Sequence, residues 1–95
     1  MQSQNNIELE NIKRMREIAN LYSITGQKEK SKNYHEKIVE LCNEKSNDEE
    51  ILILKIQSLN YLNKRYKSLE TTKNLLKINP KNMRGLINII TYLIG

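Results

Sequence analysis

Apolar residues in the first half of the chain recur every three or four positions, in two sets separated by a glycine. One set runs from Met15 to Tyr22 and the other from Ser31 to Leu41, with Gly26 between them. Spacings of three and four place each set on one face of an α-helix, and glycine readily reverses the chain between two helices. The stretch predicts a helical hairpin whose facing residues are Met15, Ile18, Ala19 and Tyr22 on one helix and Ser31, Tyr34, Ile38 and Leu41 on the other.

The same pattern occurs again 37 residues further along the chain. Without a gap, this shift matches Met15 with Leu52, Ala19 with Ile56, Tyr22 with Leu59, Ser31 with Ser68, Ile38 with Leu75, Val39 with Leu76 and Leu41 with Ile78. A further shift of 34 carries Leu52, Lys55, Ile56 and Leu59 onto Leu86, Ile89, Ile90 and Leu93. Such self-similarity is the signature of repeat proteins. It predicts an all-α fold of about five helices, arranged as two antiparallel hairpins and the first helix of a third.

Residues that start and stop helices suggest the boundaries of these elements. Ser46 and Asn47 each have a Glu three positions later, the spacing of a capping box, so either can begin the third helix. Pro80 disfavours helix in the residue before it and ends the fourth helix, and Asn82 can cap the fifth. A polar segment at 1–6 is expected to fray, and helices are expected over residues 7–25, 27–44, 49–62, 66–78 and 83–94.

Charge is distributed unevenly along the 95 residues, which carry a net charge of +5. Residues 1–50 hold eight basic and ten acidic side chains, whereas residues 51–95 hold eight basic side chains and the single acidic Glu70. A solvated basic surface explains this bias, and so does a surface that binds nucleic acid or another polyanion. Both interpretations stay open for the basic residues of the second half, which include Lys64, Arg65, Lys67, Lys73, Lys77 and Lys81.

The sequence also bears on the compartment of the protein. The single cysteine, Cys42, excludes an intrachain disulfide. The longest unbroken apolar run, residues 51–54, is far shorter than the ~20 residues that cross a bilayer, and no apolar leader opens the chain. We therefore expect a soluble cytoplasmic protein that does not bind a membrane.

The residue types that carry out catalysis are scarce. His35 and Cys42, the only His and the only Cys, lie seven positions apart on one expected helix, too far for the hydrogen bond that joins a nucleophile to its base. No pair of His or Cys residues has the spacing of metal ligands. Glu49 and Glu50 are adjacent carboxylates, but negative charge is favourable at a helix start without a further role. The sequence predicts a protein that is not an enzyme and has no metal and no cofactor.

The repeat resembles a known family. The residues that carry the likeness are Ala19, Tyr22, Gly26, Ser31, Ile38, Val39 and Leu41 in the first copy and Ser68, Leu75, Leu76, Ile78 and Pro80 in the second. In these positions the chain resembles the tetratricopeptide repeat family. It departs from the family at Ile56, where a small residue is usual, at Asn63, where a Gly turns the chain, and in a spacing that implies a three-residue insertion between Cys42 and Asp48. Divergent hairpin repeats of another type remain the alternative.

The resemblance implies a domain organisation and a function. Residues 1–11 would be an N-terminal extension and 12–95 the repeat domain, with repeats at 12–45 and 49–82 and a third helix or cap at 83–95. The first helix of each pair in this family lines a concave groove for an extended peptide, which implies a protein-interaction module. Leu54 stands where the family's clamp for acidic C-terminal tails needs an Asn, so a chaperone-tail receptor is not implied. The implied groove residues are Lys13, Arg16, Asn20, Ser23, Ile53, Gln57, Asn60, Tyr61, Arg84, Ile87 and Thr91.

The fifth expected helix is apolar on more than one side. We expect its packing stripe to be Leu86, Ile89, Ile90 and Leu93, which leaves other apolar residues pointing elsewhere. The terminal helix of an isolated repeat array needs a polar outer face. We therefore expect this helix to be covered, either by missing parts of a longer repeat protein, in which the chain is a structural segment, or by a second copy in a homodimer that contacts it through Ile87, Tyr92 and Ile94.

Overall fold

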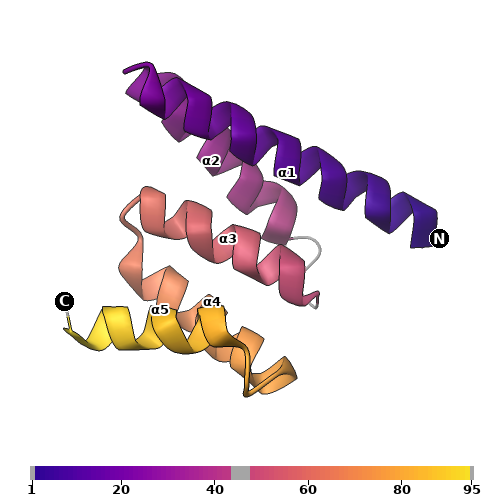
Figure 1. The fold of residues 1–95 in the computed structure, drawn as a ribbon, viewed down its shortest axis with the longest axis vertical. Coiled ribbons are helices and arrows are strands. Elements are labelled where there is room, and N and C mark those ends of the chain that lie inside the picture. The colour runs from indigo at the N-terminus through magenta and orange to yellow at the C-terminus, as the bar shows by residue number, and fades with distance from the viewer. Residues whose placement is uncertain (1, 44–47, 95) are drawn as a thin grey trace.

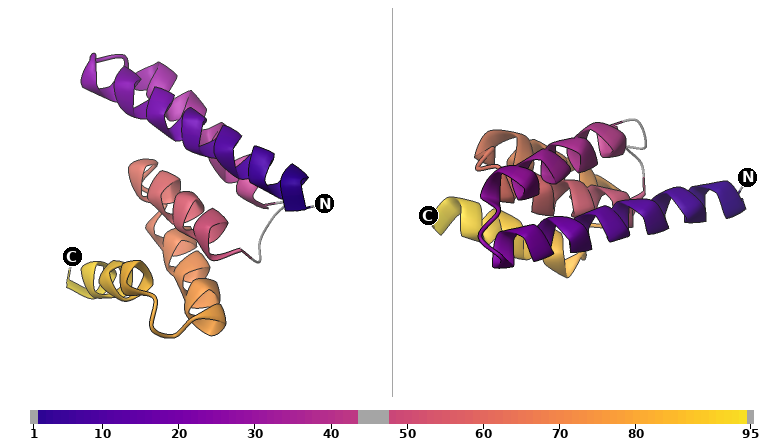
Figure 2. Two further views of the ribbon diagram at one scale, coloured as in Figure 1. Left: turned by 45° about the vertical axis from the view of Figure 1, so that its right-hand side comes forward. Right: turned by 90° about the horizontal axis from the view of Figure 1, so that it is seen from above.

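The computed structural model describes residues 2–43 and 48–94, and within these ranges the chain forms five α-helices and no strand (Figure 1). The helices are α1 (Gln2–Ile24), α2 (Lys28–Asn43), α3 (Glu49–Tyr61), α4 (Arg65–Ile78) and α5 (Met83–Ile94). Each helix packs on the next one along the chain, and α1 also touches α3. Figures 1 and 2 show α1 and α2 at one end of the molecule, α3 in the middle, and α4 and α5 at the other end. The expected all-α fold of about five helices is confirmed for the described residues.

Two helix ends turn the chain in the same way, 37 residues apart. Gly26 follows α1 with a φ of 81°, and Asn63 follows α3 with a φ of 60°. In both turns the next backbone N–H donates to the carbonyl five residues earlier, over 2.8 Å in the first and 2.9 Å in the second. A left-handed φ closes a helix end in this way and is adopted most easily by glycine and next by asparagine. Asn63 therefore performs the turn that Gly26 performs in the first hairpin.

The central helix, α3, is buried on two sides. One apolar cluster joins it to α1 and α2 through Ile12, Ile38, Cys42, Ile51 and Leu54. A second cluster joins it to α4 through Leu52, Ile56 and Leu75. A helix covered on both sides needs apolar residues around most of its circumference. This burial explains why residues 51–54 form an unbroken apolar run instead of a stripe.

Small residues let α1 and α2 approach closely. Ala19 has no exposed surface, and the buried Ser31 hydroxyl of α2 donates a 2.7 Å hydrogen bond to the Ala19 carbonyl of α1. This contact confirms the expectation that Ala19 lies in the buried helix crossing. Ile18 and Leu41 were expected on the facing surfaces as well, but they are 37% and 43% exposed and lie at the edges of the contact.

The helix boundaries agree with expectation to within one residue except at the start of α1, and the capping residue of α3 differs from those expected. α1 begins at Gln2, not near residue 7, because the polar residues before 7 include no Gly or Pro that would stop a helix. These first turns extend past the other helices (Figure 2). At α3 the observed cap is Asp48, whose carboxylate accepts the Glu50 N–H over 2.8 Å; the expected caps Ser46 and Asn47 lie outside the described residues. The Asn82 cap of α5 is confirmed, since its side chain accepts the Gly85 N–H over 3.0 Å.

α5 turns a different face toward α4 than its apolar pattern predicts. The buried residue is Gly85, at which an added Cβ would lie 3.0 Å from a methyl carbon of Leu76. Asn88, Ile89 and Tyr92 continue this face and are partly buried. The expected packing stripe is wrong apart from Ile89, since the exposed fractions are 38% for Leu86, 55% for Ile90 and 77% for Leu93. The reason is that α5 approaches α4 most closely at Gly85, which turns the other side of α5 toward α4.

Candidate functional site

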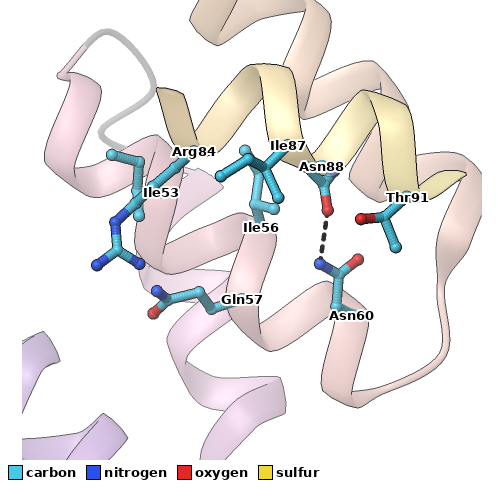
Figure 3. Close-up of a pocket in the computed structure, with 8 residues that line it drawn as sticks. All are labelled: Ile53, Ile56, Gln57, Asn60, Arg84, Ile87, Asn88 and Thr91. Carbon is cyan, nitrogen blue, oxygen red and sulfur yellow. Dashed lines mark hydrogen bonds between the residues drawn. The ribbon is translucent and has the colours of Figure 1, made fainter. Parts of the chain in front are cut away.

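A pocket of about 520 Å³ lies between α3 and α5 (Figure 3). Each helix contributes four side chains, at positions i, i+3, i+4 and i+7, which a helix places on one face. The two faces are therefore aligned along the pocket. The lining residues are Ile53, Ile56, Gln57 and Asn60 from α3 and Arg84, Ile87, Asn88 and Thr91 from α5.

Apolar side chains form the middle of the pocket wall. Ile56 of α3 is 6% exposed and lies beside Ile87 of α5, which is 56% exposed (Figure 3). Ile53, one turn earlier on α3, continues this apolar surface and is partly buried. The exposed part of Ile87 gives an incoming apolar side chain a surface to pack on.

A hydrogen-bonded amide pair closes one end of the pocket. The Asn60 side-chain nitrogen donates to the side-chain oxygen Oδ1 of Asn88 over 2.8 Å (Figure 3). The Asn88 amide nitrogen in turn donates to the buried hydroxyls of Ser68 and Thr72 on α4, over 3.1 and 2.7 Å. Asn88 thus links three helices through its side chain and fixes the position of Asn60 in the pocket wall.

Cationic side chains lie toward the other end. Arg84 points toward the same end of the pocket as Ile53 and Gln57 in Figure 3, and it is exposed. Gln57 is held from α1, because Arg16 donates a 3.1 Å hydrogen bond to its amide oxygen. Lys13, one turn before Arg16, lies 4.0 Å from the Glu50 carboxylate. Side chains of α1 and α3 are therefore bonded to each other at this end of the pocket, toward which Arg84 of α5 also points.

The residues expected in a groove divide into groups. Six of them line the pocket: Ile53, Gln57, Asn60, Arg84, Ile87 and Thr91. Lys13 and Arg16 reach α3 from α1, and Asn20 is exposed on α1. Ser23 and Tyr61 line a separate pocket of about 440 Å³ at the α1–α2 turn, together with Lys28, Glu29, Lys32 and Leu62.

Two pocket residues were missed by the sequence reasoning. Ile56 was aligned with Ala19 as a core residue, and its side chain serves both the core and the pocket. Asn88 had a signal that could have found it, since it is the only side-chain amide in a helix of which half the residues are Ile or Leu. An amide that lies among apolar residues in a helix is expected to have hydrogen-bond partners on neighbouring helices.

Of the residues expected to mediate self-association, Ile87 and Ile94 lie seven positions apart on one side of α5, and Tyr92 lies on another side. Ile87 lines the pocket, while Ile94 is 81% exposed near the end of the helix. Tyr92 is partly buried and contacts Arg65, whose guanidinium carbon lies 5.4 Å from the ring centre and which donates to the Tyr92 carbonyl over 3.2 Å.

The reactive residue types are held in the core. His35 is 3% exposed, stacks on Tyr61 with ring centres 4.1 Å apart, and has its Nδ1 2.9 Å from the Ser58 hydroxyl. Burial lowers the pKa of His35 and raises the pKa of the Cys42 thiol to about 11. Among the described residues, no group of three or more His, Cys, Asp or Glu side chains could hold a metal ion.

The basic residues of α4 do not form one narrow stripe. Lys67, Lys73 and Lys77 are all exposed. At about 100° per residue, Lys73 and Lys77 lie about 40° apart around the helix, but Lys67 lies about 120° from Lys73. Glu70 is exposed between them in the sequence. The positive charge is therefore spread around the outer side of α4.

Comparison of the chain with protein-family models, with curated proteins and with solved structures finds no match. None of the five helices in the described ranges is both long enough and apolar enough to span a lipid bilayer. Function is therefore inferred from the geometry and chemistry of the pocket.

Proposed function

We propose that this protein is a tetratricopeptide-like array of helical hairpins that binds an extended, acidic peptide segment of a partner protein along α1, α3 and α5. The observation that carries the proposal is the pocket itself, where amides and an arginine surround an apolar wall on two aligned helix faces. The matching turns at Gly26 and Asn63 support the hairpin array, and the pocket uses the first helix of successive hairpins.

The polar groups of the pocket suit a peptide backbone. An extended peptide exposes N–H and C=O groups on both edges, and side-chain amides can donate to one and accept from the other. Asn60 and Gln57 present such groups on α3, one turn apart. An apolar side chain of the peptide would then pack on Ile53 and the exposed part of Ile87.

The charge of the pocket favours an acidic ligand. Arg84 makes no hydrogen bond and no ion pair with any other described residue, so its guanidinium is available to a carboxylate in a two-bond contact. Arg16 adds a second positive charge through its hydrogen bond to Gln57, which lines the same pocket. The positive charge of residues 51–95 would also speed the approach of an acidic partner.

The proposal can be tested by NMR titration of the ¹⁵N-labelled chain. The probe is an acetylated peptide of about seven residues that alternates Glu with Val and Leu, and its Glu→Gln analogue is the control ligand. We expect the largest shifts at the side-chain amides of Gln57, Asn60 and Asn88. The largest shifts at Ser23 and Tyr61 instead would move the site to the pocket near the α1–α2 turn.

A charge-matched pair of variants tests the role of Arg84. Arg84→Gln should weaken binding of the acidic peptide by about 5- to 10-fold, because a partly solvated charged hydrogen bond is lost. Arg14→Gln removes the same charge from an exposed position on α1 and should change the affinity less than about 2-fold. Equal losses in both variants would show that the peptide responds only to net charge.

A further inference from the structure

α5 presents three distinct faces. One face packs on α4 and holds Gly85 and Ile89. A second face lines the pocket and holds Arg84 and Thr91; at about 100° per residue, it lies about 120° around the helix from the first. The third face is apolar and exposed, and its centre lies about 120° beyond Arg84 and Thr91. It consists of Met83, Leu86, Ile90, Leu93 and Ile94, with exposed fractions of 68%, 38%, 55%, 77% and 81%.

The spacing on this third face is that of a helix-pairing seam. Met83, Leu86, Ile90 and Leu93 follow one another at intervals of three, four and three residues, which repeats every 3.5 residues on average as in coiled coils. The four positions are also symmetric about residue 88, since Met83 and Leu93 lie five positions from it and Leu86 and Ile90 lie two. A seam with this symmetry fits a second copy of itself in the antiparallel direction, about a two-fold axis.

The size of this face matches a weak dimer interface. Its five side chains expose on the order of 600 Å² per chain, compared with about 800 Å² per partner in a standard protein–protein interface. Exposed apolar patches of more than a few hundred Å² are uncommon on monomers and mark interaction sites. We propose that two copies of this chain pair through this face of α5, antiparallel, with Met83 of one copy against Leu93 of the other and Leu86 against Ile90.

Charge favours the antiparallel direction over the parallel one. Arg84 is the only charged residue of α5. An antiparallel pair places the two Arg84 side chains eight residues apart along the axis, or about 12 Å at ~1.5 Å per residue, beyond the ~8 Å screening length of physiological salt. A parallel pair would place them side by side. Arg84 and Thr91 of the pocket face lie outside the seam, at about 80° or more from each of its four residues.

Sedimentation equilibrium tests the pairing. The intact chain, measured from about 1 to about 300 µM, should shift from 11.2 kDa toward twice that mass. Ile90→Glu should weaken the dimer by about 100-fold or more, because each dimer loses two buried isoleucines near its axis. Ile24→Glu makes the same change on α1, where Ile24 is 80% exposed, and should leave the dimer intact. A wild-type chain that stays monomeric at about 300 µM would overturn the proposal and leave this face to a different partner.

Cysteine cross-linking tests whether the two α5 helices of the dimer run antiparallel, and it remains informative even if Ile90→Glu disturbs folding. The double variant Met83→Cys with Leu93→Cys should form a covalent dimer under mild oxidation, whereas each single variant should not, because only the antiparallel pair brings 83 against 93. The two cysteines lie ten positions apart on one helix and cannot bridge within a chain. Buried Cys42 does not compete. Cross-linking of the single variants as readily as the double variant would refute the antiparallel pair.

Salt dependence separates this proposal from the peptide-binding proposal. The seam contains no ion pair, so added salt should not weaken the dimer and, by screening two copies of a +5 chain, should strengthen it slightly. Binding of the acidic peptide should weaken as salt rises. A dimer that dissociates as salt rises would contradict the apolar seam, with no consequence for the peptide site.

Discussion

Replacing Asn88 by alanine should loosen α5 from the rest of the molecule. Asn88 makes three side-chain hydrogen bonds, at 2.7, 2.8 and 3.1 Å, and they reach both α3 and α4. The other contacts of α5 are modest, because it meets α4 mainly through Gly85 and the partly buried Ile89 and Tyr92. The Asn88 side chain is therefore the main polar attachment of this helix.

The size of the effect follows from the bonds that are lost. Each net hydrogen bond contributes about 0.5–1.5 kcal/mol, and the better helix propensity of alanine returns about 0.5 kcal/mol. We expect Asn88→Ala to lower the free energy of unfolding by about 1–4 kcal/mol. In a domain of this size, each 1 kcal/mol shifts the Tm by about 4–8 °C.

Two measurements check this prediction. Urea denaturation followed by circular dichroism gives the change in the free energy of unfolding, and hydrogen exchange should show lost protection in α5 before α1 and α2. Thr91→Ala, at an exposed position three residues later, is the control and should change stability by less than about 0.5 kcal/mol. Unchanged unfolding and unchanged exchange in Asn88→Ala would refute the view that these hydrogen bonds hold α5.

Two further predictions concern the first hairpin. Ala19→Leu should lower the free energy of unfolding by about 1–3 kcal/mol, because Ala19 is fully buried where Ser31 bonds its carbonyl; an unchanged Tm would contradict the helix crossing. Burial lowers the pKa of His35, so below about pH 6.5 the unfolded chain binds a proton more readily than the folded chain does. Lowering the pH should therefore reduce the free energy of unfolding by up to about 1.4 kcal/mol per pH unit, until the pH reaches the pKa of His35 in the folded chain. Urea denaturation between about pH 7.5 and 5.5 should show this loss in the wild type and a smaller one in His35→Gln, and equal slopes would argue against it.

The helices and their hairpin turns follow from the sequence because their causes are local. Apolar spacing of three and four depends only on neighbouring turns of one helix, so the five helices were predicted with ends that differ mainly at the first helix. The turns at Gly26 and Asn63 are equally local, since each depends on the φ of one residue. The family resemblance, and not the local pattern, implied a groove along the first helix of each hairpin, and six of its expected residues line one pocket.

The tertiary structure decided which face each helix turns toward its neighbours. The apolar stripe of α5 pointed to Leu86, Ile90 and Leu93, but α5 packs through Gly85, where a missing side chain allows close approach to α4. Asn88 acquires its role only because Ser68 and Thr72, far away in the sequence, lie within hydrogen-bond distance. Hydrophobic periodicity indicates which faces of a helix can be buried. Close contacts and hydrogen-bond partners from other helices determine which of these faces is buried, and they exist only in the folded chain.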